Sequence, residues 1–167
     1  MTGKVDTQLT STNVDLIKKA TINDVVKVVD NLLPSDMQEI IDGAGLNPVL
    51  SVACSILTTN SVVFYLPDGK VGGVAGVSDD GCIWMHCTEA VKKYPILFWK
   101  EARKWVDSLP HRLLYNKADI RNTLHLKLLR SLGFKFLRLV PQGPKNLYFV
   151  EFVRLWFNFY LQLHQLF

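Results

Sequence analysis

Residues 122–134 read Asn-Thr-Leu-His-Leu-Lys-Leu-Leu-Arg-Ser-Leu-Gly-Phe, and this stretch decides the fold. Asn122 can cap the start of a helix, because its side-chain oxygen accepts a backbone N–H of the first turn. Gly133 can end that helix in a left-handed turn, and Phe134 then enters a strand. The helix, predicted over 121–131, directs leucines at helical spacing toward the interior: Leu124, Leu128 and Leu132. The stretch therefore predicts a helix that packs on a sheet and leads directly into its next strand.

Periodicity and turn signals divide the rest of the chain into further helices and strands. Strands are predicted at residues 14–20, 61–66, 71–77, 82–88, 112–115, 134–140 and 147–153. Helices are predicted to begin at Thr21, at Ser35 and at Asn47–Pro48, and to cover 94–109. Ser35 and Gln38 have the spacing of a capping box, so Pro34 is expected to end the helix before them.

This order, a three-strand meander followed by strand–helix–strand connections, predicts an α/β fold with a mixed central sheet and helices on both faces. Residues 82–88 and 112–115 are predicted to be parallel neighbours, because the helix between them requires a right-handed crossover. Gly72, Gly73 and Gly76 lie inside a predicted strand and not before a helix. Their position indicates close strand packing or a bulge rather than a phosphate-binding loop.

The element order and the pattern Asn122-x-x-His125-x-x-x-Leu129-x-x-x-Gly133-Phe134 resemble the GNAT acetyltransferases, in which an Asn opens the last helix and a Gly-Phe pair ends it. The chain also resembles a narrower group, the small GNAT-like internal virion proteins of short-tailed bacteriophages. Four stretches carry that likeness: 37–48, 68–77, 81–84 with Thr88, and 115–119 running into Asn122. The likeness covers about residues 14–154, which implies a GNAT-like domain over that range. The polar composition of residues 1–13 predicts a flexible N-terminal arm, and residues 155–167 form an aromatic C-terminal tail.

In the family, a glycine-rich turn holds the pyrophosphate of acetyl-CoA at a helix N-terminus. The matching residues here, 88–95, read Thr-Glu-Ala-Val-Lys-Lys-Tyr-Pro and contain no glycine. Close approach of backbone N–H groups to a phosphate favours glycine, and Glu89 adds a negative charge at this point. We therefore expect no bound cofactor. If CoA binds at all, the resemblance implies contacts from Thr88, Lys92, Lys93 and Asn122.

The family's catalytic groups are also missing from the matching positions. Leu129 stands where many GNAT enzymes have a tyrosine that protonates the leaving thiolate, and leucine cannot donate a proton. His86 is the one candidate base on the strand before the turn, and a lone histidine on a strand is more often structural. The sequence therefore predicts no catalytic residue and a degenerate acetyltransferase fold that is not an enzyme.

Cysteine content and hydropathy exclude some other classes. The chain has three cysteines, Cys54, Cys82 and Cys87, and an odd number argues against a disulfide framework. Side chains alternate between the two faces of a strand, so Cys87 points away from Cys82 and His86, and no metal site is predicted. No apolar run reaches the roughly 18 residues of a membrane span.

The charges are distributed unevenly along the chain. Residues 1–90 carry 5 Lys/Arg and 11 Asp/Glu, whereas residues 91–167 carry 14 Lys/Arg and 4 Asp/Glu. This asymmetry indicates either attraction between the two halves or a basic surface for an acidic partner or nucleic acid.

The tail, residues 155–167, is rich in aromatic and aliphatic side chains and contains no Asp, Glu, Lys or Arg. It either packs on its own domain or binds another protein. Because so many exposed apolar residues would exceed what soluble monomers normally show, we favour a protein partner. The predicted partner-binding residues are Trp156, Phe157, Phe159, Tyr160, Leu163 and Phe167.

These observations predict a non-enzymatic structural or assembly component of a short-tailed phage virion. Its expected partners are other virion proteins, and its expected location is the virion and, during assembly, the bacterial host cytoplasm. Two alternatives stay open. The first is an active acetyl-CoA-dependent N-acetyltransferase, which saturable binding in a titration with acetyl-CoA would support. The second is a nucleic-acid-binding module, for which the sequence shows no motif and which steep salt dependence of binding would support.

Overall fold

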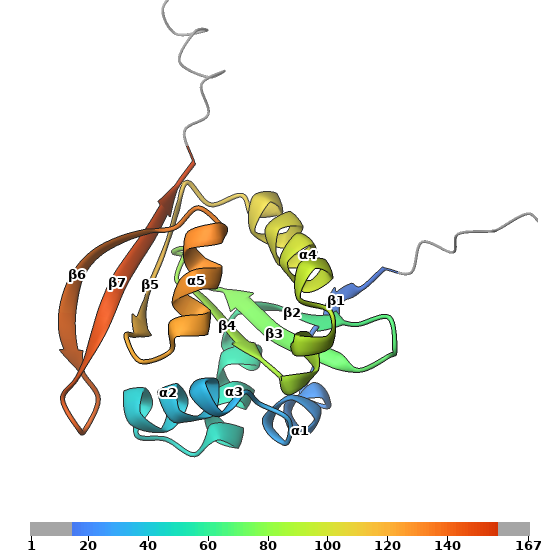
Figure 1. Ribbon diagram of the computed structural model, residues 1–167, viewed down its shortest axis with the longest axis horizontal. Helices are drawn as coiled ribbons and strands as arrows, with labels where there is room; N and C mark the ends of the chain where they lie inside the picture. The colour runs from blue at the N-terminus through green and yellow to red at the C-terminus, as the bar shows by residue number, and fades with distance from the viewer. Residues whose placement is uncertain (1–14, 157–167) are drawn as a thin grey trace, which may run out of the picture.

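In a computed structural model, which describes residues 15–156, the strands form two antiparallel sheets (Figure 1). The predicted N-terminal arm and tail residues 157–167 lie outside the described residues. The first sheet has the order β1-β2-β3-β4, with bounds Ile17–Lys19, Asn60–Tyr65, Val71–Val77 and Ile83–Cys87. The second has the order β5-β7-β6, with bounds Leu113–Asp119 for β5, Lys135–Gln142 for β6 and Leu147–Leu155 for β7.

Helices lie on both faces of the first sheet, and the predicted α/β fold class is confirmed. Their bounds are α1 Asp24–Val29, α2 Pro34–Ala44, α3 Pro48–Thr58, the short 3₁₀ helix η1 Glu89–Lys93, α4 Pro95–Ser108 and α5 Thr123–Ser131. Buried residues of α1 and α3 pack on one side, in a cluster with β2 and β3. Buried residues of α4 and α5 form the larger cluster on the other side.

The two sheets are joined at a single parallel bridge, between Cys82 and Tyr115. There the Tyr115 N–H donates to the Gly81 carbonyl oxygen at 3.0 Å. One residue further along, the side-chain Nδ2 of Asn116 donates to the Ile83 carbonyl oxygen at 2.7 Å. Because a side chain has taken the place of the next strand partner, β4 and β5 diverge beyond this point. The prediction of parallel neighbours is therefore wrong beyond this one contact: within the described residues the two strands meet in parallel only at Cys82 and Tyr115, and they lie in different sheets.

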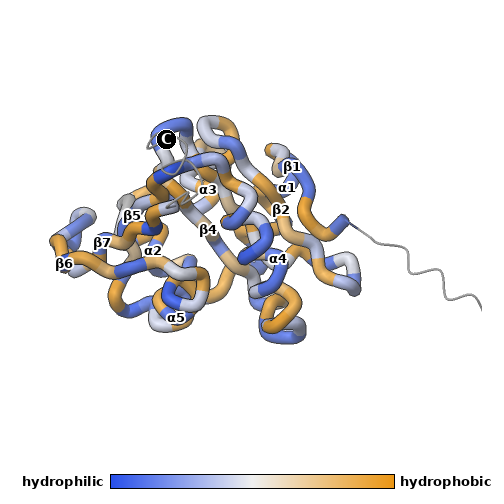
Figure 2. Tube along the Cα trace, turned by 90° about the horizontal axis from the view of Figure 1, so that it is seen from above, coloured by the Kyte–Doolittle hydropathy of each residue, from blue (hydrophilic) through white to orange (hydrophobic). Residues whose placement is uncertain are grey.

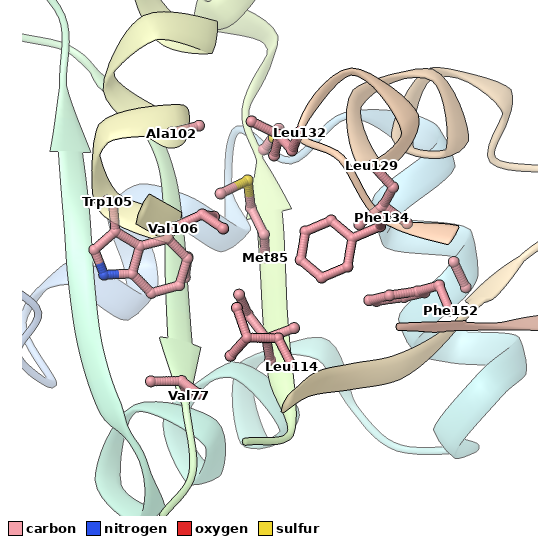
Figure 3. Close-up of a cluster of buried hydrophobic side chains, with 14 of the residues drawn as sticks. Val77, Met85, Ala102, Trp105, Val106, Leu114, Leu129, Leu132, Phe134 and Phe152 are labelled. Atoms are coloured by element: carbon pink, nitrogen blue, oxygen red, sulfur yellow. The ribbon is translucent and has the colours of Figure 1, made fainter. Parts of the chain in front are cut away.

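The larger cluster of buried side chains fills the angle between the two sheets (Figure 3). Met85 on β4 and Leu114 on β5 contribute from the two walls, and Trp105 contributes from α4. Phe134 and Phe152 meet edge to face, with ring centroids 5.2 Å apart. This core holds the diverging strands at a set separation without further backbone pairing.

Proline and asparagine set the helix starts, in one case differently from the prediction. Pro34 begins α2 instead of ending the helix before it, because a proline lacks the N–H that the first turn leaves unpaired anyway. Ser35 is therefore inside the helix and does not cap it. The predicted start of α3 is confirmed, since the Asn47 side chain accepts hydrogen bonds from the N–H groups of Val49 and Leu50. In α5 the predicted cap is confirmed too, with Asn122 Oδ1 3.3 Å from the His125 N–H.

The inward face of α5 differs from the predicted leucine stripe. Leu132 is buried as expected, and Leu129 is buried beside Phe134 (Figure 3). Leu124, by contrast, is 54% exposed. The helix is rotated so that its first turn faces solvent and a cavity instead of the core, and this rotation positions the candidate site.

Polar and apolar surfaces are both distributed unevenly. Asp42 of the acidic half receives hydrogen bonds from Arg121 and Lys145 of the basic half, each at 2.7 Å, so part of the charge asymmetry is attraction within the fold. Along the edge strand β6, Leu137 and Leu139 are exposed on a hydrophobic stretch (Figure 2). Within residues 15–156, no single helix is long and apolar enough to cross a membrane; only α2 and α3 together pass that test, and they are bent by 83°.

Candidate functional site

A cavity of about 230 Å³ lies at the C-terminal end of β4, lined by the start of α2, by η1, by the start of α4 and by α5. Figure 1 shows α5 in front of the gap between β4 and β5, with α2 next to the N-terminal end of α5. Most of the lining is apolar and comprises Leu33, Val91, Pro95, Phe98, Leu124 and Leu128. The polar and ionisable part of the lining comprises Asp36, Cys87, Lys92 and His125. The cavity thus combines a hydrophobic wall with a few groups that can exchange protons or carry charge.

The free edge of β4 borders this cavity. The Cys87 N–H donates to Asp36 Oδ2 at 2.6 Å, and the Cys87 carbonyl oxygen accepts from the Leu33 N–H at 2.9 Å. Both backbone groups of Cys87 therefore point away from β3 and are held by the start of α2. Met85 lies two residues earlier in the strand, so its N–H and C=O have the same orientation, away from β3.

Beside the cavity, four side chains form what we call the carboxylate–histidine cluster: Asp36, Glu39, Asn122 and His125. Asn122 Nδ2 lies 2.8 Å from Asp36 Oδ1 and 2.8 Å from Glu39 Oε2. Glu39 Oε1 also accepts from the Asp119 N–H at 3.2 Å, and Glu39 Oε2 lies 3.6 Å from His125 Nδ1. The cluster thus joins α2 to the end of β5 and the start of α5.

The charges of this cluster are set by its contacts. Burial acts to lower the pKa of His125, but the carboxylates of Glu39 and then Asp36 outweigh it, and the pKa of His125 is raised. Burial acts to raise the pKa of Glu39, yet His125, Asn122 and the Asp119 N–H together lower it. At neutral pH the Glu39 carboxylate is therefore ionised, and His125 has an increased tendency to be protonated.

Two other ionisable groups on β4 stay neutral. Burial, followed by the negative charge of Asp36, raises the pKa of Cys87 well above that of a free thiol. The thiol is therefore not ionised at neutral pH, which excludes it as a thiolate nucleophile. His86 alternates with Cys87 and faces the α1–α3 side, where its ring lies 5.6 Å from that of Trp84. Burial lowers the pKa of His86, so this candidate base is neutral at neutral pH, and it does not line the cavity.

The structure separates the residues that the sequence suggested as CoA contacts. Thr88 is fully buried; its Oγ1 donates to the Val71 carbonyl oxygen at 2.6 Å and accepts from the Ala90 N–H. Asn122 is also buried, within the carboxylate–histidine cluster. Lys92 lines the cavity, and Lys92 and Lys93 both line an adjacent open groove of about 690 Å³. Only the lysines are therefore placed where a ligand could reach their charges.

The turn at η1 uses most of its early N–H groups internally. The Glu89 N–H donates to the Asn31 carbonyl oxygen at 2.9 Å, and the Val91 N–H donates to the Thr88 carbonyl oxygen at 3.2 Å. With the Ala90 N–H bonded to Thr88 Oγ1, these three amides are not free to hold a phosphate. The lysines of the adjacent groove, Lys27, Lys70, Lys92 and Lys93, are the cationic groups near this turn.

Among the predicted partner-binding residues, only Trp156 is described. It is 42% exposed, its N–H donates to the Arg112 carbonyl oxygen at 2.9 Å, and the Arg154 guanidinium lies 4.9 Å from its ring centroid. Phe157, Phe159, Tyr160, Leu163 and Phe167 lie outside the described residues. Contact with another protein therefore stays a prediction for the tail.

Sequence reasoning missed three members of the cluster: Asp36, Glu39 and His125. A signal for the first two was present, because Asp36, Glu39 and Asp42 recur every third residue and so share one face of a helix. An acidic stripe of this kind is ordinarily solvent-exposed. Here Asp36 and Asp42 are 4% and 2% exposed, because that face meets β5 and the start of α5. His125 was part of the quoted pattern, but no local feature marked it as a cavity residue.

Comparisons with known proteins concern the fold. No family model matches the chain, and no curated protein matches it in sequence. A GNAT-family acetyltransferase from Bacillus cereus superposes with a TM-score of 0.59 at 16% identity, covering 85% of this chain and 97% of that one. This chain has the GNAT fold.

Two further acetyltransferases superpose on the same GNAT fold. A phosphinothricin acetyltransferase from Sinorhizobium meliloti, in complex with acetyl-CoA, has a TM-score of 0.57 at 15% identity and covers 83% of this chain and 86% of that one. A spermidine N-acetyltransferase chimera from Vibrio cholerae has a TM-score of 0.61 at 8% identity, covering 83% and 93%. At these identities the likeness is one of fold.

The comparisons correct the predicted function. The prediction of a non-enzymatic phage virion component, and with it the prediction that the chain is not an enzyme, is wrong: the matched structures are acetyltransferases, which favours the enzyme alternative. Nothing in them supports the narrower resemblance to internal virion proteins. The prediction failed because it equated a missing glycine turn and Leu129 with loss of the whole site. The tertiary structure has a cavity at the C-terminal end of β4 and places His125 in its wall.

Proposed function

We propose that this chain is an N-acetyltransferase that takes its acetyl group from a CoA thioester bound between β4 and α5. The observation that carries the proposal is the cavity at the C-terminal end of β4, with its apolar wall and His125. The shared fold with acetyltransferases supports it. Reaction of an amine with the thioester yields an amide and a thiol.

The residues present fit the thioester arm of such a ligand. The apolar lining suits the aliphatic part of the arm, and the polar side chains of the lining, Asp36 and His125, are available to its amide groups. The diphosphate end would be held differently from the family pattern. Because the amides of Glu89, Ala90 and Val91 are bonded internally, lysine ammonium groups of the groove would hold the phosphates.

Each part of the site then has a distinct task. The bound thioester supplies an activated acyl carbonyl. Leu33, Phe98 and Leu128 exclude water from its surroundings, which limits hydrolysis. Lys92, which lines both the cavity and the groove, connects the apolar part of the site to its cationic part.

Filling the mouth of the cavity is expected to weaken binding of acetyl-CoA. Leu124 lies in the lining and is 54% exposed, so the larger indole in Leu124→Trp would occupy the mouth with little effect on the core. We expect affinity to fall at least tenfold, which corresponds to about 1.4 kcal/mol. Calorimetric titration of the full chain with acetyl-CoA, together with an acetyl-transfer assay on a panel of amines, measures both binding and turnover.

The matched control is Leu137→Trp on β6, which is 61% exposed and lies outside the cavity. It should bind acetyl-CoA as the wild type does. Absence of saturable binding by the wild type would overturn the proposed function. Equal weakening by both substitutions would place the binding site elsewhere.

A further inference from the structure

His125 occupies a position from which it can act on a ligand in the cavity. It lies in the first turn of α5, where its N–H is held by Asn122 Oδ1, and its side chain is 14% exposed and lines the cavity. Its Nδ1 faces Glu39 Oε2 at 3.6 Å, so Nε2 is the ring nitrogen left for other contacts. Glu39 in turn is held by Asn122 Nδ2 and the Asp119 N–H. A histidine oriented by a fixed carboxylate is the usual construction of a proton-transfer group.

The position at which many GNAT enzymes carry a proton-donating tyrosine cannot donate a proton in this chain. Leu129 is 5% exposed and packs in the core, and its side chain has no proton to donate. His125 lies one helical turn before Leu129 on the same helix, and it also lines the small space of about 20 Å³ next to Leu129. The two positions therefore border the same end of the gap.

We infer that His125 is a catalytic residue of the proposed reaction, donating a proton from Nε2 to the sulfur that leaves the acyl carbon, with Glu39 as the residue that positions it. This inference rests on the proposed acetyltransferase function and names the group that replaces the missing tyrosine hydroxyl.

The proton and electron balance needs no further reactant. A bond forms between the amine nitrogen and the acyl carbon while the carbon–sulfur bond breaks, and the electron pair of that bond stays on sulfur. His125 Nε2 gives its proton to the sulfur. The neutral imidazole then accepts the proton that the nitrogen releases, so His125 ends in its starting state. The products are an amide and a thiol.

The charged and titratable groups around His125 favour its protonated form before this step. From α2 it faces Glu39 and Asp36, whose carboxylates raise its pKa against the effect of burial. From β4 it faces Cys87, which stays a neutral thiol, and lies near His86, whose pKa is lowered. Lys92 of η1 lines the same cavity, with its ammonium 2.5 Å from the Glu89 carboxylate. Two carboxylates at close range therefore dominate the field at the imidazole.

The first test measures the free protein. Proton NMR titration of the full chain, assigned with His125→Gln, should show His125 titrating above its ordinary pKa of about 6.5. In Glu39→Gln the pKa should fall, because the amide removes a negative charge and keeps the size of the side chain. A wild-type His125 that titrates below the ordinary value would overturn the inference, whether or not Glu39→Gln folds.

The second test measures turnover. His125→Gln should lower kcat about 100-fold or more, the usual contribution of a general acid, while calorimetric affinity for acetyl-CoA stays within a factor of about two. Wild-type kcat should decline as pH rises through the pKa of His125, because the donor loses its proton. In Glu39→Gln this decline should begin at lower pH, a change that a purely structural role would not produce.

The control is Lys127→Gln, which changes an exposed residue of the same helix and should leave kcat and its pH profile unchanged. If the wild type binds acetyl-CoA and turns over an amine while His125→Gln keeps full kcat, this inference fails and the proposed function survives. If the wild type neither binds acetyl-CoA nor acetylates any amine, the proposed function fails and the inference fails with it.

Discussion

Asn122→Ala is expected to lower the free energy of unfolding by about 3–5 kcal/mol, the range for breaking one side of a buried charged network. Asn122 is 2% exposed, and its Nδ2 donates to carboxylates of Asp36 and Glu39 at 2.8 Å each. Alanine would leave both buried carboxylates short of a donor and would also remove the cap of α5. Because hydrogen bonds to charged groups contribute about 1.5–3 kcal/mol each, the two losses dominate the effect. Urea denaturation followed by circular dichroism measures it.

A second asparagine provides the matched control. Asn47 also caps a helix, with its Oδ1 accepting from the N–H groups of Val49 and Leu50, but it is exposed and touches no carboxylate. Asn47→Ala should therefore cost about 1 kcal/mol, the usual value for a lost N-cap. Similar losses for the two variants would contradict the view that Asn122 holds the buried carboxylates, and would reduce its role to capping.

Gly81→Ala is expected to destabilise the protein by about 3–5 kcal/mol and to weaken acetyl-CoA binding as well. Gly81 has a φ of +92°, and a Cβ placed on it would lie 2.1 Å from the Leu113 carbonyl oxygen. That contact forces the start of β5 away from Gly81, where the Tyr115 N–H now bonds to the Gly81 carbonyl oxygen. Because this is the point at which the two sheets are joined, β4 and the strand that leads into α5 would move relative to each other, and Cys87 of β4 and His125 of α5 both line the cavity.

The control for this prediction is Gly69→Ala. Gly69 also has a positive φ, of +77°, but a Cβ there meets nothing within 4 Å. It should cost about 1–2 kcal/mol, the conformational penalty of a left-handed residue alone. Thermal and urea unfolding of both variants, with calorimetric titration of acetyl-CoA, separates the steric cost from the conformational one. A loss for Gly81→Ala no larger than that for Gly69→Ala would show that the junction adapts freely.

The candidate site was less accessible to sequence reasoning than the fold. The prediction of lost activity compared single positions, Leu129 and the glycine-free turn, with the pattern of the GNAT family. In the structure the ionisable groups at the cavity come from α2, β4, η1 and α5, and Asp36 meets Asn122 across 86 positions of the chain. The sequence shows that acidic residues recur every third position in α2, but not that this face is buried. Burial depends on what packs against a helix and not on the helix itself.

The fold class, the helix cap at Asn122 and the left-handed ends of helices were determined by the sequence alone, because caps, periodicity and turn conformations depend on neighbours within a few residues. The gap between β4 and β5 was decided only in the tertiary structure. It exists because the Asn116 side chain takes the place of a strand partner at Ile83, and because Asp36 and Leu33 hold the backbone of Cys87. The cavity and its carboxylate–histidine cluster follow from these long-range contacts, which no local stretch of the chain encodes.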